Sequence, residues 1–283
     1  MNSEELYKQL EKDFITPYLS DSWAERMQPM SDFLTNNFKK RSMGLVCDNS
    51  TQIRRIYTAV FPSNKVMQSI LDKDEADVML FVHHPMDWDI RKAPQVYQQM
   101  DRDLLQQFRE RRISIYNLHV PLDNYGEYST SVTLAKALGV ELRRPFAHYF
   151  GALCGVFGKT SFSTIRGLKE KFESVVGHRT SLYQYGSDET KDGVVAVAAG
   201  GGNMISVLEE VARERVNTFL TGITIRNEVS EISHKYAEDK RINILGGTHY
   251  STEKPACRAM CEYFKRLGLP SEFIEGTPIL EDL

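Results

Sequence analysis

Short apolar runs alternate with amphipathic segments along most of the chain. The runs have the length of buried strands and cover residues 53–61, 78–82, 113–118, 194–198, 218–221 and 242–245. Helical spacing of apolar residues marks most of the segments between them, at 63–72, 93–111, 129–139, 205–212 and 252–268. Strands that alternate with helices are typical of βα units and parallel sheets. The pattern therefore predicts an α/β fold.

The same pattern divides the chain into two α/β lobes with mainly parallel sheets. The predicted lobes cover 43–144 and 186–283, and a less regular connecting segment covers 145–185. Residues 1–42 precede the first lobe and show helical spacing, so we expect an N-terminal helical segment there. A chain of 283 residues is long enough for this arrangement.

Composition and charge exclude several classes of protein. An apolar fraction of 41% is enough for a large core, which argues against a disordered chain. The net charge of -3 argues against a protein that coats nucleic acid or an anionic membrane, so neither partner is expected. We find no membrane span and no secretory signal in the sequence. The four cysteines form no CxxC pair, which is typical of reduced thiols in a cytoplasmic protein.

Three polar clusters each follow a predicted buried strand. His83-His84-Pro85 follows one strand, the segment His119 to Asp123 follows the next, and the segment His249 to Glu253 follows the last. In open α/β sheets, ligands bind in the crevice at the carboxyl ends of the strands. We therefore expect a site in such a cleft. Each cluster by itself could also be an ordinary turn or a local hydrogen bond.

The residue types in these clusters point to a metal site. Imidazole nitrogens and carboxylate oxygens together are ligands for Zn, Fe, Mn, Co or Ni, and the clusters contain no cysteine for a thiolate zinc site. Five residues are the candidate ligands: His83, His84, Asp123, His249 and Glu253. A mononuclear catalytic site usually takes three protein ligands, so five ligands with two carboxylates fit two ions better.

Two prolines bear on the local backbone of these clusters. Pro121 disfavours a helix between His119 and Asp123. Pro255 is compatible only with the first turn of a helix, so we expect the last helix to begin near Thr252. Glu253 would then lie in the first turn, where the helix dipole stabilises a carboxylate.

Two weaker motifs could contribute to substrate binding. Gly200-Gly201-Gly202 lies between a strand and a helix and could bind a phosphate or carboxylate, although a tight turn is the simpler explanation. Asp87 and Trp88 follow the His-His-Pro motif, and Trp88 could form a wall for a flat ring. A solvated turn is the alternative for this pair.

The order of the motifs resembles the dinuclear-metal-centre family named after yeast NGG-one-interacting factor three, whose members are often called GTP cyclohydrolase 1 type 2. The resemblance covers about residues 43–283. The matching stretches are Met43 to Val46, Val82 to Pro85, His119 to Asp123, Val195 to Gly202, Leu220 to Gly222 and Gly247 to Glu253 with Pro255. The family's acidic residue after Thr-Gly is replaced by Ile223.

The resemblance implies a two-lobed α/β subunit with two metal ions and a toroidal homo-hexamer. It implies the same five ligands, with His119 supporting them without binding metal itself. The implied activity is metal-dependent hydrolysis, of the GTP cyclohydrolase 1 type 2 kind, of a nucleotide or related small molecule. The alternative is a non-catalytic hexameric metal-binding or regulatory scaffold.

Overall fold

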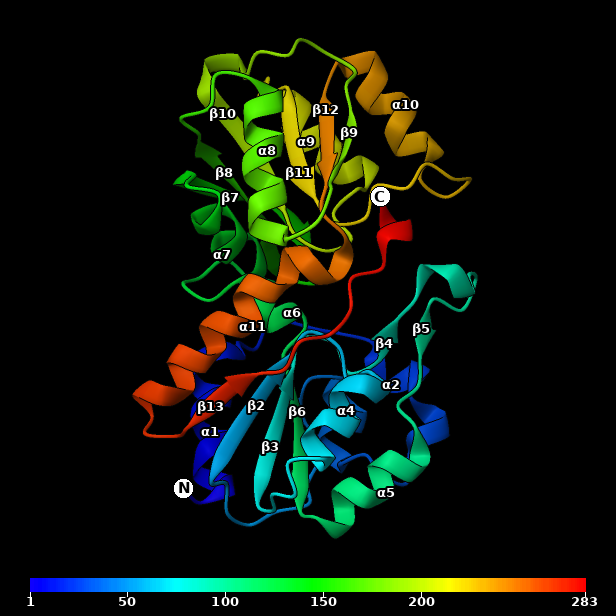
Figure 1. The fold of residues 1–283 in the computed structure, drawn as a ribbon, viewed down its shortest axis with the longest axis vertical. Helices are drawn as coiled ribbons and strands as arrows, with labels where there is room; N and C mark the ends of the chain where they lie inside the picture. Colours follow the sequence, from blue (N-terminus) through cyan, green and yellow to red (C-terminus); the bar gives the residue numbers. More distant parts are fainter. The chain divides into compact units, whose positions relative to one another are not determined.

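The computed structural model describes residues 1–283, which form two compact units (Figure 1). Unit 1 comprises Met1–Leu122, Phe150–Ala152 and Cys257–Thr277. Unit 2 comprises Asp123–Tyr149, Leu153–Ala256 and Pro278–Leu283. Each unit has a sheet with helices packed on it, so the predicted α/β class is confirmed. The units are discontinuous in sequence, whereas the predicted lobes are continuous stretches.

Unit 1 is built on a five-stranded sheet in the order β1-β6-β3-β2-β13. Its strands are β1 Gly44–Cys47, β2 Arg55–Ala59, β3 Val78–Val82, β6 Ile113–Asn117 and β13 Ser271–Phe273. β13, β2, β3 and β6 are parallel, and β1 runs antiparallel to β6. Because β13 pairs with β2, the segment that follows residue 256 belongs to unit 1, although the sequence pattern assigned it to the second lobe.

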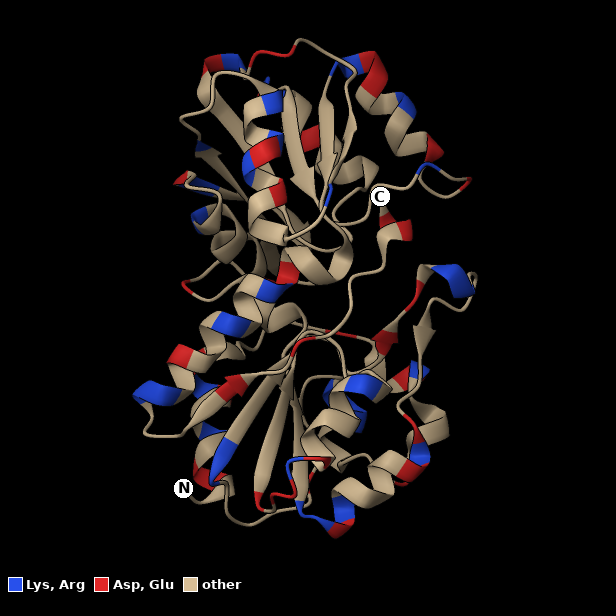
Figure 2. Cartoon of the chain, in the orientation of Figure 1, with Lys and Arg blue, Asp and Glu red and all other residues tan.

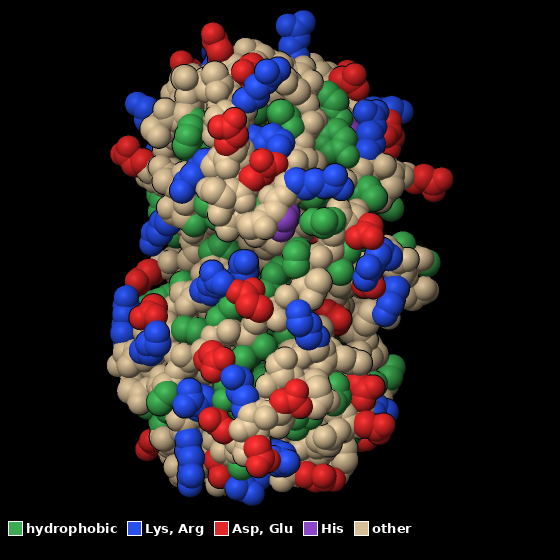
Figure 3. Space-filling view, viewed as in Figure 1, with side chains coloured by type: hydrophobic (Ala, Val, Ile, Leu, Met, Phe, Trp, Pro, Cys, Tyr) green, Lys and Arg blue, Asp and Glu red, His purple; other side chains and the backbone are tan.

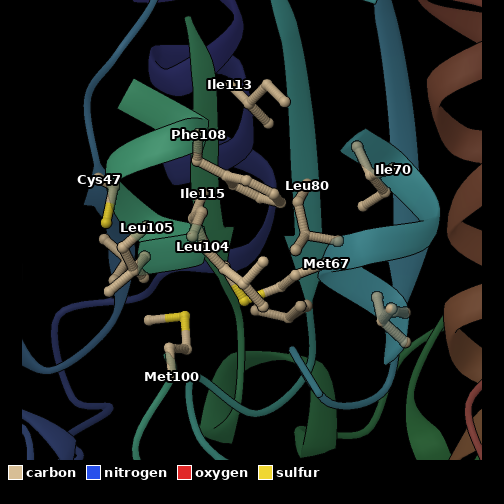
Figure 4. Packing of buried hydrophobic residues seen from close by; sticks show 14 of the residues in the cluster. Cys47, Met67, Ile70, Leu80, Met100, Leu104, Leu105, Phe108, Ile113 and Ile115 are labelled. Carbon is tan, nitrogen blue, oxygen red and sulfur yellow. The ribbon is translucent and has the colours of Figure 1, made fainter. Parts of the chain in front are cut away.

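Helices cover the apolar sheet of unit 1. They are α1 Ser3–Phe14, α2 Trp23–Arg26, α3 Asn36–Arg41, α4 Asn64–Leu71 and α5 Arg102–Glu110, with a 3-10 turn at Gln28–Met30. Figure 4 shows Met67, Ile70, Leu104 and Phe108 of α4 and α5 packed with Leu80 of β3 in one apolar cluster. All five residues of β3 are buried, as expected for a central strand covered on both faces.

One predicted helix is shorter than expected. The pattern predicts a helix over 93–111, but α5 begins only at Arg102, after Asp101, whose side chain accepts from the backbone N–H groups of Asp103 and Leu104. The preceding residues form a hairpin of β4 Asp87–Trp88 and β5 Tyr97–Gln98, with a 3-10 turn at Ile90–Lys92. Pro94 prevents a helix here, because it removes a backbone donor and restricts the residue before it.

Unit 2 is built on a six-stranded sheet in the order β7-β8-β10-β11-β12-β9. Its strands are β7 Glu141–Tyr149, β8 Ala152–Lys159, β9 Ser181–Tyr183, β10 Val194–Ala198, β11 Thr218–Thr221 and β12 Asn243–Gly246. The three central strands β10, β11 and β12 are parallel, while β8 and β9 run antiparallel to their neighbours. The carboxyl ends of β10, β11 and β12 therefore share one edge of the sheet.

The two faces of this sheet are covered by different helices. The helices of unit 2 are α7 Thr130–Ala137, α8 Ile165–Val176, α9 Ile205–Arg213 and α10 Glu231–Lys240, with 3-10 turns at Lys191–Gly193 and Leu280–Asp282. Val195 and Val197 pack with α7 and α8, while Ala196 and Ala198 pack with α9 and α10. This alternation along β10 follows the two-residue period of a strand.

Two further helices complete the chain: α6 Val120–Asp123 and α11 His249–Arg266. Charged residues gather on helices and loops, while β3, β6, β10, β11 and β12 carry none (Figure 2). All four cysteines are free thiols. None of the helices combines the length and the apolar composition needed to cross a bilayer.

Candidate metal centre

Three histidines of unit 1 meet at the carboxyl ends of two neighbouring strands. His83 and His84 directly follow β3, and His119 lies two residues beyond β6. β3 and β6 are parallel, with Val82 opposite Asn117, so their ends coincide. One ring nitrogen from each histidine lies within 4.8 Å of the others, and all three side chains are buried. This spacing suits a shared cation.

Hydrogen bonds orient two of these imidazoles. His83 Nδ1 lies 3.0 Å from the carbonyl oxygen of Leu118, and His119 Nδ1 lies 2.8 Å from Asp21 Oδ2. A carbonyl or carboxylate oxygen can only accept, so the proton of each neutral ring is on Nδ1 and the lone pair is on Nε2. Such an arrangement is usual for metal-binding histidines.

Aromatic rings hold the third imidazole. Phe61 stacks on His84 with a centroid distance of 4.7 Å, and the Trp23 ring meets His84 edge-on at 5.7 Å. Trp23 also packs edge-on against His119 at 5.1 Å. These contacts limit rotation of the imidazoles and surround them with apolar groups. Electrostatic attraction between a cation and its ligands is strengthened in surroundings of this kind.

A histidine and a glutamate of unit 2 form a second group of donors. His249 is the first residue of α11 and Glu253 follows one turn later, so both lie on one face of the helix. His249 Nε2 lies 3.1 Å from Glu253 Oε1, and both side chains are buried. The pair offers one nitrogen and one oxygen donor of the kinds that borderline divalent ions bind.

The helix α11 begins earlier than the sequence suggests. We expected a start near Thr252, but the structure places His249 in the first turn and Pro255 inside the helix. The reason is a set of caps: Asp282 Oδ2 accepts from the His249 N–H at 2.9 Å, and Thr248 Oγ1 accepts from the Ser251 N–H at 3.2 Å. A helix capped in this way tolerates the single bond lost at Pro255.

Asp123 ends the short helix α6. Its Oδ1 accepts from the Thr130 hydroxyl at 2.8 Å, which fixes the half-buried carboxylate. The expectation that Pro121 would exclude a helix is wrong, because Pro121 is the second residue of α6 and proline is tolerated in a first turn.

Comparison with known proteins identifies the family. A family model described as Duf34/NIF3 (NGG1p interacting factor 3) matches residues 30–277. The chain belongs to the DUF34/NIF3 family. The resemblance inferred from the motifs is therefore confirmed.

Relatives of the chain within the DUF34/NIF3 family carry one recurring name. A GTP cyclohydrolase 1 type 2 homolog from Pyrococcus horikoshii is 27% identical over 242 residues, which cover 84% of this chain and 90% of the relative. A protein of the same name from Yersinia pestis is 26% identical over 223 residues, covering 78% and 83%. Among solved structures, protein ybgI, of unknown function, has a TM-score of 0.76 and 21% identity over 98% of this chain and 100% of that chain. This structural likeness shows the fold.

The glycine-rich turn of this DUF34/NIF3 protein packs directly on the donors of unit 2. Gly200 has a φ of +69°, and a Cβ atom there would lie 2.1 Å from Glu253 Oε1. The Gly200 N–H donates to Thr252 Oγ1 at 2.9 Å. Gly202 is also tight, because its Cβ would lie 2.8 Å from Thr221 Oγ1, whereas a Cβ at Gly201 would make only an ordinary contact with Ile223 Cδ1 at 3.8 Å. Close packing therefore explains two of the three glycines, and their part in substrate binding stays a prediction.

Asp87 and Trp88 lie on β4 rather than in a solvated turn. Trp88 is buried and packs against Tyr97 with a centroid distance of 5.1 Å. Burial raises the pKa of Asp87, although its Oδ1 accepts from the Trp88 N–H at 2.9 Å. The indole of Trp88 therefore already has Tyr97 as an aromatic partner. A role for this pair in binding substrate stays a prediction.

Asp21 is the residue of this site that the sequence did not indicate. Its carboxylate is almost fully buried against His119, from which it is separated by 98 positions in the chain. It precedes the stretch matched by the DUF34/NIF3 model, in the loop between α1 and α2, where the sequence has no motif. Only the fold brings the two residues together.

Replacing Asp21 by alanine is expected to weaken metal binding by about 10-fold or more, the usual effect of losing a residue that supports a metal site without binding the ion. The His119 ring would lose the acceptor that fixes its orientation. Titration of the metal-free protein against a chelator of known affinity measures the change. Asp103→Ala, which removes an exposed carboxylate from α5, is the control. Equal affinity of the two variants would show that Asp21 does not support the site.

Two cavities of unit 2 lie at the opposite edge of its sheet. They have volumes of about 350 and 400 Å³ and share Lys191, Arg215 and Val216. Their basic lining includes Arg215, two residues past α9, and Lys240, the last residue of α10, and a cation at such a position offsets the exposed helix carbonyls. The cavities therefore need no anionic ligand to explain their charge.

Burial also argues against thiolate ligands. It raises the pKa of Cys47 and Cys154 to about 12, so both thiols stay protonated near neutral pH. The clustered donor groups of this chain are histidines and a glutamate and contain no cysteine.

Proposed function

We propose that the protein binds two divalent metal ions per chain through His83, His84, Asp123, His249 and Glu253. The observation that carries the proposal is the buried cluster of His83, His84 and His119, in which ring nitrogens approach within 4.8 Å. The buried His249–Glu253 pair supports it with a carboxylate. Zn, Fe, Mn, Co or Ni fit this nitrogen and oxygen donor set.

The protein's own residues prepare the site before any ion arrives. The Leu118 carbonyl sets the tautomer of His83, which places its donor lone pair on Nε2, and the Asp21 carboxylate orients the supporting ring of His119. Thr130 holds the carboxylate of Asp123. Divalent ions bound there would supply Lewis acidity and lower the pKa of water, which are the requirements for hydrolysis at neutral pH.

We further propose that the protein is a metal-dependent hydrolase of the GTP cyclohydrolase 1 type 2 kind, acting on a nucleotide or a related small molecule. The name of the relatives supports this reaction class. On the face shown in Figure 3, Lys and Arg are interspersed with Asp and Glu, without a large basic area. A small-molecule substrate fits such a surface better than nucleic acid.

A second candidate is a non-catalytic metal-binding or regulatory scaffold. One observation favours it: Arg91 and Arg226, two arginines that could serve to bind a triphosphate, already have carboxylate partners. Arg226 contacts both oxygens of Glu231 at 2.7 and 2.8 Å, and Arg91 contacts both oxygens of Asp89 at 2.7 and 3.0 Å. Binding a triphosphate through these arginines would require breaking those pairs.

For either function we propose a toroidal homo-hexamer as the assembly, on the basis of the family resemblance. Light scattering coupled to size-exclusion chromatography measures the mass in solution, and a monomer at micromolar concentration would contradict this assembly.

Elemental analysis and an activity panel test the function. We expect about two metal ions per chain after mild purification or reconstitution, as two-metal sites require. The metal-loaded protein is then offered nucleotides and phosphoesters, and hydrolysis of any of them supports the enzyme. Tight metal binding without turnover supports the scaffold. A chain that never retains metal contradicts both.

A further inference from the structure

The last residues of the chain contact the first turn of α11. Residues 278–283 belong to unit 2, and within them Asp282 is completely buried although it has a carboxyl side chain and lies next to the C-terminus. Asp282 lies beyond the stretch matched by the family model, which ends at residue 277. The burial of a carboxylate in such a place requires partners that compensate for lost hydration.

Asp282 is hydrogen-bonded to the loop that follows β11 and to the first residue of α11, which follows β12. Its carboxylate accepts from the His249 N–H at 2.9 Å. Its main-chain carbonyl accepts from the N–H groups of Thr224 and Ile225 at 2.6 and 2.8 Å. One residue therefore links the loop after β11 to the start of α11.

The bond to His249 matters because of where it lies on the helix. The first N–H groups of a helix have no partner within it, and a carboxylate at this end is also favoured by the helix dipole. Thr248 caps the Ser251 N–H locally, but the His249 N–H is bound by a residue 33 positions away. His249 is itself the first metal-ligand candidate on α11, and Glu253 follows one turn later.

We propose that Asp282 is a positioning residue for the metal donors of unit 2. Its side-chain oxygen fixes the first turn of α11, which sets where the His249 ring and the Glu253 carboxylate lie. This inference rests on the proposed metal-binding function. It assigns Asp282 no contact with metal or substrate.

The test compares three variants of the full-length chain: Asp282→Ala, Asp282→Asn and Asp239→Ala. Asparagine retains an oxygen that accepts from the His249 N–H, whereas alanine does not. Asp239 is an exposed carboxylate on α10 of the same unit and serves as the control. The carbonyl of residue 282 still accepts from Thr224 and Ile225 in every variant, so the C-terminal segment keeps its anchor.

Zinc affinity is measured by chelator competition, and the absorption spectrum of the cobalt-loaded protein reports the geometry of the donors. We expect Asp282→Ala to bind zinc about 10-fold more weakly or worse, as for other residues that orient metal ligands, and to alter the cobalt spectrum. Asp282→Asn should stay close to the wild type in both measurements, and Asp239→Ala should match it. A residue that only stabilises the fold would not change the spectrum.

Two results would overturn the inference while leaving the proposed function intact: wild-type affinity in Asp282→Ala, or a loss in Asp282→Asn as large as that in Asp282→Ala. If the wild type binds neither zinc nor cobalt, the proposed function fails first. Should Asp282→Ala not fold, Asp282→Ser provides a smaller change at the same position. Hydrogen exchange of the His249 amide in the metal-free protein then checks the cap directly, and the amide should exchange faster in Asp282→Ser than in the wild type.

Discussion

Glu253→Ala is expected to abolish binding of at least one of the two proposed metal ions. Glu253 is the carboxylate that lies 3.1 Å from His249 Nε2, and both side chains are buried. Without it, the positive charge of the ions would lose a compensating anion, and two cations would repel each other in surroundings of low polarity. Metal stoichiometry by elemental analysis should fall from about two ions per chain to one or none.

The same variant should lose thermal stability only in the presence of metal. Metal binds the native state and not the unfolded chain, so lost binding removes that stabilisation. Melting curves with and without chelator separate this effect from damage to the fold. His148→Ala, which removes an exposed imidazole of unit 2, is the matched control and should keep both the metal and the melting temperature. Retention of both ions by Glu253→Ala together with their loss from His148→Ala would show that the ligand assignment is wrong.

The fold class was predictable because the buried strands are short and uncharged. Val78–Val82 and Val194–Ala198 are continuous apolar runs, and each is covered by helices on both faces. The boundaries of the two units were harder to predict from the sequence. β13 joins β2 of unit 1 after a helix that begins in unit 2, and no composition shift marks this return.

The residues of the candidate site that directly follow the ends of parallel strands were predictable from the sequence. His83 and His119 are separated by 36 positions, yet they converge because β3 and β6 are parallel neighbours. The supporting residues were not predictable. Asp21 and Asp282 lie in segments without motifs, and only the folded chain shows that they bind His119 and the His249 N–H. The early start of α11 was missed for the same reason, since its cap is remote in sequence.

Gly200→Ala is expected to weaken metal binding by about 10-fold or more. The substitution displaces the Glu253 carboxylate, and this should cost as much affinity as removing a residue that orients a metal ligand. The new Cβ would lie 2.1 Å from Glu253 Oε1, so the carboxylate must move. The variant also carries the strain of a positive φ, which costs about 1 kcal/mol of unfolding free energy for a residue other than glycine.

Two other glycines separate these effects. Gly177 has a φ of +83° and no atom within 4 Å of its Cβ position, so Gly177→Ala should show the backbone strain alone. A Cβ at Gly201 would make only an ordinary contact, with Ile223 Cδ1 at 3.8 Å, and its φ is not positive, so Gly201→Ala should be nearly neutral. The melting temperature without metal should therefore fall by similar amounts in Gly200→Ala and Gly177→Ala, while chelator competition should detect weaker metal binding only in Gly200→Ala. Equal metal affinities in these two variants would mean that the Glu253 carboxylate can move without loss, and that its position beside the glycine-rich turn is not required for binding.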